Sequence, residues 1–195
     1  MHGLINRGIQ RFVTDTYGDT TWRATMLRAG FDFSNFEAMW HYDRSVTLTL
    51  LQAVCDVLDR PYDELLEDIG TYLVSHKNVE ALRRLLRFGG VTFEEFLHSL
   101  DDLPDRARLA VADLDLPPLE LLENSPEQYS LRCHSPEPGW GSFFLGVLRA
   151  MADDYGVLAL LSHEGEANGC EIITIRLLDG EYAVGRGFEL AARAP

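Results

Sequence analysis

The sequence predicts a single α+β domain, in which a helical half is followed by a small antiparallel sheet that carries one helix. Three observations support this fold class. Apolar residues recur at helical spacing from residue 2 to about residue 112. After Pro117 and Pro118 the pattern changes to short strands with one helix among them, in the order ββαββ. No Pro- or Ser-rich linker, repeat or low-complexity tract interrupts the 195 residues.

The helical half contains six predicted helices, several of which end at glycine, the residue that most easily adopts the left-handed conformation of a helix C-cap. These glycines are Gly18, Gly30 and the pair Gly89–Gly90. A connecting segment follows the second helix, and its expected apolar anchors are Phe33, Phe36 and Trp40. The predicted helices cover residues 2–17, 20–29, 43–58, 61–73, 78–88 and 92–112.

The sixth helix carries a proline on its apolar side. Thr92 and Glu95 form a capping box that starts this helix. Pro104 lies four residues after Leu100, on the stripe that also contains Phe93 and Leu97. Proline lacks an amide proton and clashes with the carbonyl four residues earlier, so we expect it to kink or restart the helix.

In the second half, two predicted strands, 119–123 and 128–134, are joined by a turn over residues 124–127. A helix over residues 138–156 follows, and then strands 157–164 and 170–178 with a turn at residues 165–169. We therefore predict one domain over residues 1–187, with a helical lobe at about 1–112, a sheet lobe at about 118–180 and a short tail at 188–195.

Composition excludes several classes of partner. The chain has 31 acidic and 17 basic residues and a net charge of −14, which opposes binding to nucleic acid or anionic lipid but not to a protein. No apolar run approaches the roughly 20 residues of a membrane helix, and the N-terminus does not resemble a secretion signal. The three cysteines form no CxxC motif and no disulfide framework, which favours a cytoplasmic location.

No motif for a catalytic nucleophile, nucleotide phosphate or metal is present, so we do not expect an enzyme. The six histidines show no metal-ligand spacing, and His98 lies off the apolar stripe, which predicts a solvated side chain. Cys133 alternates with apolar residues on one strand face, which is typical of a buried structural thiol. A redox role would need a second thiol, and Cys170 is the candidate.

Three stretches together resemble the haem nitric oxide/oxygen-binding family (H-NOX, also called HNOB), and the resemblance extends from residue 1 to about residue 180. They are MHGLINRGIQRFVTDTYGDTTW, LRRLLRFGGVTFEEFLHSLDDL and CHSPEPGWGSFFLGVLRAMADDYG. The resemblance implies a helical lobe and a sheet lobe that hold haem between them, and a role in nitric oxide sensing and signal transduction.

The chain departs from the family pattern at both places that would hold haem. In the family, a histidine that follows an LDxL-type stretch ligates the iron, but here Pro104 follows LDDL. In the family, a Tyr-x-Ser-x-Arg motif binds the haem propionates, and the matching positions here are Cys133, Ser135 and Glu137. A second register has the right residue types at the wrong spacing and loses alignment with the following PGW; it comprises Tyr129, Ser130 and Arg132.

These departures act independently on haem binding. Proline offers no ligand atom, and a glutamate would repel two propionates where an arginine would bind them. Replacement ligands at His98 or His134 are disfavoured, because both are expected to point away from the core. Apolar contacts alone could still hold a porphyrin, or the same residues could be plain core. The candidate lining residues are Ile5, Ile9, Leu97, Leu100, Phe143, Phe144 and Val147.

Three functions remain open. The first is a stand-alone sensory or regulatory domain that acts in trans on a histidine kinase or a cyclic-di-GMP enzyme without the usual haem ligation. Its input would be thiol oxidation at Cys133 and Cys170, or a small apolar ligand in the vacated pocket. The second is a haem-based NO or O2 sensor with an unrecognised iron ligand. The third is an adaptor that kept the fold and lost the ligand.

Overall fold

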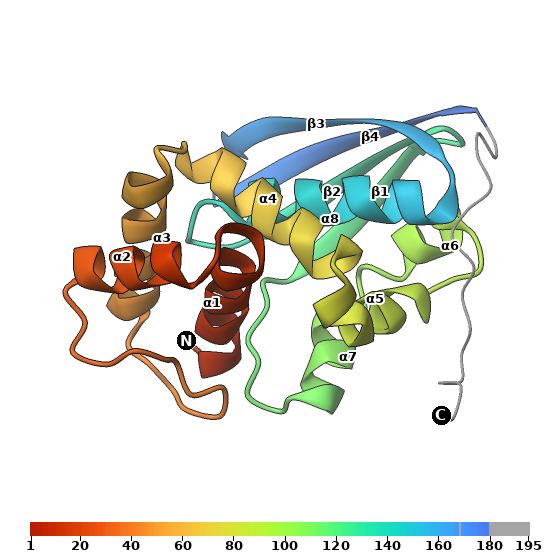
Figure 1. Ribbon diagram of the computed structural model, residues 1–195. Coiled ribbons are helices and arrows are strands. Elements are labelled where there is room, and N and C mark those ends of the chain that lie inside the picture. The colour runs from red at the N-terminus through yellow and green to blue at the C-terminus, as the bar shows by residue number, and fades with distance from the viewer. Residues whose placement is uncertain (168, 180–195) are drawn as a thin grey trace.

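The computed structural model describes residues 1–167 and 169–179, and these residues form the expected α+β fold (Figure 1). A four-stranded sheet lies along one side of the molecule with α8 against it, α1–α3 lie at one end, and α5–α7 lie below the other. The helices are α1 (Gly3–Tyr17), α2 (Asp19–Ala29), α3 (Arg44–Leu58), α4 (Tyr62–Ser75), the 3₁₀ turn η1 (Lys77–Val79), α5 (Glu80–Arg87), α6 (Phe93–His98), α7 (Leu103–Ala110) and α8 (Trp140–Tyr155). The strands are β1 (Leu119–Ser125), β2 (Gln128–His134), β3 (Leu158–Ala167) and β4 (Cys170–Asp179).

The helix ends follow the glycines. Gly18 and Gly30 have φ values of 87° and 72° at the ends of α1 and α2. Residues with a Cβ rarely adopt this region of backbone conformation. One predicted anchor of the connecting segment is wrong. Phe36 is 1% exposed at the centre of an aromatic cluster, whereas Trp40 is 64% exposed. Residue 40 anchors the segment through its backbone instead, because its carbonyl accepts a hydrogen bond from the Gly3 amide at 2.7 Å.

The predicted restart at Pro104 is confirmed. α6 ends at His98, and α7 begins at Leu103 with the proline in its first turn. An amide is not needed there, because the first amides of a helix have no partner within it. Arg106 of α7 donates to the Ser99 carbonyl at 2.8 Å and so connects the two helices across the break.

The sheet is antiparallel, with strand order β1-β2-β4-β3. The last hairpin is longer than predicted, because β3 continues to Ala167 and Glu166 pairs with Glu171 after an irregularity that follows His163. One face of the sheet packs against α8, and its buried side chains form the core of the sheet lobe with α6 and α7. A second core, made from α1–α4, fills the helical lobe.

The two lobes meet where α4 crosses α8 at close range. Gly70 of α4 lies against the Phe143 carbonyl, and Gly146 of α8 lies against the Glu67 carbonyl, so a Cβ at either glycine would overlap the opposite backbone. An ion pair between Arg149 and Glu67 lies beside this contact. The crossing fixes the position of α4 over the middle of α8.

The predicted tail at 188–195 and the predicted domain end at residue 187 lie outside the described residues. Within the described part of the chain, every helix is too short or too polar to cross a bilayer.

Candidate functional site

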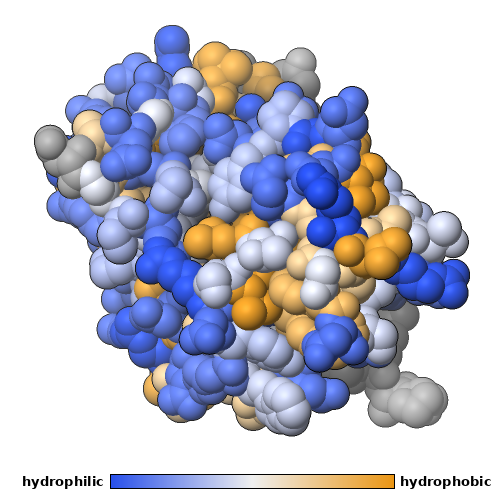
Figure 2. Space-filling model, turned by 90° about the vertical axis from the view of Figure 1, so that its left-hand side faces the viewer, coloured by the Kyte–Doolittle hydropathy of each residue, from blue (hydrophilic) through white to orange (hydrophobic). Residues whose placement is uncertain are grey.

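A cavity of about 1290 Å³ lies between the lobes, and α1, α3, α4, α5, α7, α8 and the segment before α8 supply its walls. Its volume exceeds the range of about 300–1,000 Å³ common for small-molecule sites. Most of the lining is aliphatic or aromatic. The apolar wall reaches the surface, because Leu4 and Leu48 line the cavity and are 40% and 47% exposed. Figure 2 views the molecule from the end where α1–α3 lie, and it shows apolar side chains gathered near the middle of this face among polar ones.

The structure divides the candidate lining residues into two groups. Five of the seven predicted residues are in the cavity wall: Ile5, Ile9, Phe143, Phe144 and Val147. The other two, Leu97 and Leu100, are fully buried in the sheet-lobe core and do not line the cavity. Both precede α7, Leu97 in α6 and Leu100 in the turn between the two helices, and both face the sheet-lobe core, whereas Leu103 and Ala107 of α7 line the cavity.

Pro104 is buried beside the cavity wall, between the lining residues Leu103 and Ala107. Neither histidine nor cysteine is among the described residues that line the cavity. The phenol of Tyr62 is present, but burial raises its pKa and so opposes the phenolate that would bind iron. Met1 also lines the cavity, so the described wall offers iron a thioether but no histidine or cysteine.

Glu137 lines the cavity and forms an ion pair with Arg44, the first residue of α3. The position at which the resemblance implies a propionate-binding arginine thus holds a carboxylate that is already neutralised. Ser135 does not line the cavity. Its hydroxyl accepts the Glu137 amide at 3.0 Å and orders the turn before α8. The alternative register is disfavoured, because Tyr129 is core and Arg132 pairs with Glu120 outside the cavity.

The two candidate replacement ligands point elsewhere. The His98 side chain is 54% exposed, 3.7 Å from Glu123, as the helical spacing predicts. The His134 side chain is 45% exposed, 3.2 Å from Glu120, on the face of β2 opposite Leu131 and Cys133. Neither lines the cavity.

The two thiols of the sheet lobe lie on neighbouring strands but on opposite faces. Cys133 is opposite Glu171 in the ladder, and Cys170 is opposite His134. Because side chains alternate along a strand, this register points the two sulfurs away from each other. Cys133 is fully buried, and burial strongly raises the pKa of its thiol. The arrangement favours a structural role for Cys133.

A buried glutamate that the sequence analysis did not single out holds the start of α8. The Glu171 carboxylate accepts the amides of Gly139 and Gly141 at 3.0 Å, and His163 lies 3.4 Å from it. It could have been found from the alternation of β4, because Glu171 shares the inward face with Ile173 and Ile175. The bonds set the position of the segment that carries Glu137.

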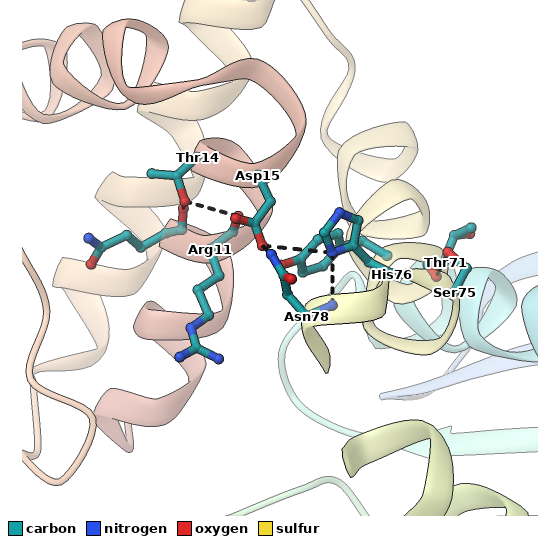
Figure 3. A network of polar contacts seen from close by, with 9 residues as sticks. Arg11, Thr14, Asp15, Thr71, Ser75, His76 and Asn78 are labelled. Carbon is teal, nitrogen blue, oxygen red and sulfur yellow. Dashed lines mark hydrogen bonds and ion pairs between the residues drawn. The ribbon is translucent and has the colours of Figure 1, made fainter. Parts of the chain in front are cut away.

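A polar network at the edge of the cavity joins α1 to the end of α4 (Figure 3). Asp15 accepts the Tyr72 hydroxyl at 2.5 Å and the Asn78 amide nitrogen at 3.0 Å, and His76 lies 3.8 Å away. Burial alone would raise the pKa of Asp15, but the hydrogen bonds from Tyr72 and Asn78 outweigh it and lower the pKa. Asn78 also lines the cavity.

A model of the family described as haem-NO-binding matches residues 2–159. The chain belongs to this family, also called H-NOX. Soluble guanylate cyclase gcy-31 of Caenorhabditis elegans is 27% identical over 181 residues, which cover 91% of this chain and 26% of the cyclase. Soluble guanylate cyclase 89Da of Drosophila melanogaster is 19% identical over 94% of this chain and 28% of its own length. This H-NOX chain therefore spans about a quarter of the length of these relatives.

Solved structures agree on the H-NOX fold. The Fe(II) unliganded H-NOX protein from K. algicida matches with a TM-score of 0.79 at 19% identity, over 94% of this chain and 100% of that one. The H-NOX protein from S. oneidensis in the Fe(II)NO state matches with a TM-score of 0.74 at 19% identity, over 92% and 100%. H-NOX domains are haem-binding sensor domains of nitric oxide signalling rather than catalytic domains.

The residues of this H-NOX domain do not fit haem as the family holds it. Where the resemblance places the iron-ligating histidine this chain has Pro104, and where it places the propionate-binding arginine the chain has Glu137, paired with Arg44. Proline has no atom that can ligate iron, and the Glu137 carboxylate carries the same charge as a propionate, whereas the cavity wall is largely apolar.

Proposed function

We propose that this H-NOX domain is a sensory or regulatory domain that works without haem iron. The observation that carries the proposal is the cavity wall: it is large and apolar, yet its described part contains no histidine or cysteine. Pro104, at the position that the resemblance gives to the iron ligand, is buried beside this wall. The signal would then be the occupation of the cavity by a molecule that makes no bond to iron.

The proposed output is control of a signalling enzyme. The relatives in animals are soluble guanylate cyclases, in which the matching region is about a quarter of the protein. For this chain we propose a histidine kinase or a cyclic-di-GMP cyclase or phosphodiesterase as partner. The net charge of −14 suits a protein partner and opposes nucleic acid and anionic membrane.

The test is an absorption spectrum and an iron assay on protein expressed with excess haem precursor. We expect no Soret band and no stoichiometric iron. A Soret band that persists through gel filtration would overturn the proposal and support a haem-based sensor with an unrecognised ligand. Single conversion of Tyr62 to Phe, and of His98 and His134 to Ala, would then locate the ligand.

A further inference from the structure

Two arginines of α1 face the cavity, and neither forms a close ion pair with a described residue, although the charge of Arg11 helps to lower the pKa of Asp15. Arg7 and Arg11 are one helical turn apart and both line the cavity. Arg7 donates only to neutral oxygens, at 3.3 Å to the Gln10 side chain and at 3.4 Å to the Phe36 carbonyl. Arg11 has no hydrogen bond or ion pair from its guanidinium to any described residue, and Figure 3 shows its side chain pointing away from the carboxylate of Asp15.

This pair is unusual for the chain. The molecule carries 31 acidic residues against 17 basic ones, yet three arginines and two glutamates line the cavity. Glu137 pairs with Arg44, and Glu37 also lines the cavity, so these charged side chains sum to +1, with Arg7 and Arg11 adjacent on α1. Like charges four residues apart on a helix destabilise it slightly, and Asp15, four residues after Arg11, offsets part of this repulsion.

Apolar surface adjoins the two guanidinium groups. Leu4, Ile5 and Ile9 lie on the same side of α1 and line the cavity. Gly8 lies between the arginines, and a Cβ built there meets no atom within 4 Å. The cavity therefore combines a long apolar interior with a cationic rim at α1, and the wall is open at Gly8.

We propose that the cavity binds an amphiphilic carboxylate, a molecule with a long apolar body and one anionic head group, as a metal-free ligand. The apolar body lies among the aliphatic and aromatic side chains, and Arg7 and Arg11 hold the carboxylate through charge-assisted hydrogen bonds. This inference rests on the proposed function, because the ligand occupies space that haem would otherwise fill.

The experiment uses haem-free protein and the fluorescent fatty acid cis-parinaric acid, with oleate and methyl oleate as competitors. We expect saturable binding of one parinarate per chain and displacement by oleate. Methyl oleate has the same apolar body without the charge, and we expect it to compete about tenfold more weakly.

Charge variants locate the head group. We expect Arg11→Glu to weaken parinarate binding about tenfold or more, Arg11→Lys to retain most of it, and Gly8→Phe to abolish it by filling the opening without unfolding the protein. Arg23→Glu is the matched control, because Arg23 is exposed on α2, away from the cavity, and makes the same change in net charge.

Each outcome decides one question. Absence of parinarate binding to haem-free protein would overturn this inference and leave the proposed function standing. Equal binding by Arg11→Glu and Arg23→Glu would overturn the anion site. A stable Soret band in the unaltered protein would overturn the proposed function itself, and the spectrum reports it independently of any fatty acid.

Discussion

The thiols of the sheet lobe differ in accessibility, and this difference bears on a redox input. Cys133 is enclosed between β2 and α8, and burial raises the pKa of its thiol, whereas Cys170 is half-buried near the end of its strand. Thiolate is the reactive form, so the two cysteines are expected to react at very different rates.

With native protein at pH 8, we expect iodoacetamide to modify Cys170 and to leave Cys133 unmodified until the protein unfolds. Mass spectrometry of tryptic peptides gives the extent at each site, and urea-unfolded protein is the control. Rapid modification of Cys133 in the native state, or a disulfide-linked Cys133–Cys170 peptide, would support thiol oxidation as the input signal.

Asp15 links folding stability to pH. Its pKa is lowered in the folded protein from the ordinary value of 3.8, so the folded state favours the carboxylate. The stabilisation is present above pH 3.8 and is lost as the pH falls through the lower folded pKa. We expect Asp15→Asn to lower the melting temperature at pH 6 and to have less effect at pH 3. A uniform loss across that range would show that packing, not charge, is responsible.

At the residue scale, the apolar residues of the cavity wall have a local sequence signal, whereas the polar residues do not. Ile5, Ile9 and Val147 follow from helical spacing, which is a local property. The Arg44–Glu137 pair joins residues far apart in the chain, and no local pattern encodes it. The sequence places Arg7 and Arg11 one helical turn apart. It does not show that both side chains line a cavity.

Among the elements, the crossing of α4 and α8 depends on the absence of two side chains. We expect Gly70→Ala and Gly146→Ala each to destabilise the protein by about 1–3 kcal/mol, because the added methyl group overlaps the backbone of the opposite helix. Urea unfolding monitored by circular dichroism measures the loss. Unchanged midpoints for both variants would show that the helices lie further apart.

Gly8 is the opposite case on α1. Its added Cβ meets nothing within 4 Å, and the residue lies in the interior of a helix. We expect Gly8→Ala to stabilise the protein by about 0.5–1 kcal/mol, because alanine loses less backbone entropy than glycine in a helix. Urea unfolding monitored by circular dichroism measures the gain, and Gly70→Ala is the contrasting variant. A destabilised Gly8→Ala protein would indicate that residue 8 is packed.

The elements themselves were largely predictable, because glycine stops, a capping box and a buried proline are local signals. The break at Pro104 was expected, but its effect on Leu97 and Leu100 was not, since it depends on how α6 packs against the sheet. Trp40 was misassigned for a similar reason: Phe36 already occupies the interior, and the backbone of residue 40 makes the contact with α1.

For the whole molecule, two substitutions should restore what the family uses to hold haem. We expect the double variant Pro104→His with Glu137→Arg to take up haem with a Soret band, because the histidine supplies a ligand and the arginine joins Arg44 as a site for propionates. Each single variant should retain less haem after gel filtration. A double variant that folds but takes up none would show that the cavity does not accept a porphyrin.

The fold itself followed from the change of pattern after Pro117 and Pro118, because helical and strand periodicities are properties of the chain. The relative position of the lobes did not follow from it. That position depends on backbone contacts at Gly70 and Gly146, and glycines in a sequence do not reveal which helix they meet.

Because α4 and α8 touch backbone to backbone at those two glycines, the lobes cannot slide closer there, and separation would break the contact. We therefore expect any movement of one lobe against the other to be a change of angle about this crossing. A molecule bound between α1 and α7 would push the lobes apart at a distance from the crossing. We expect the movement it causes to be largest at the outer ends of the two lobes.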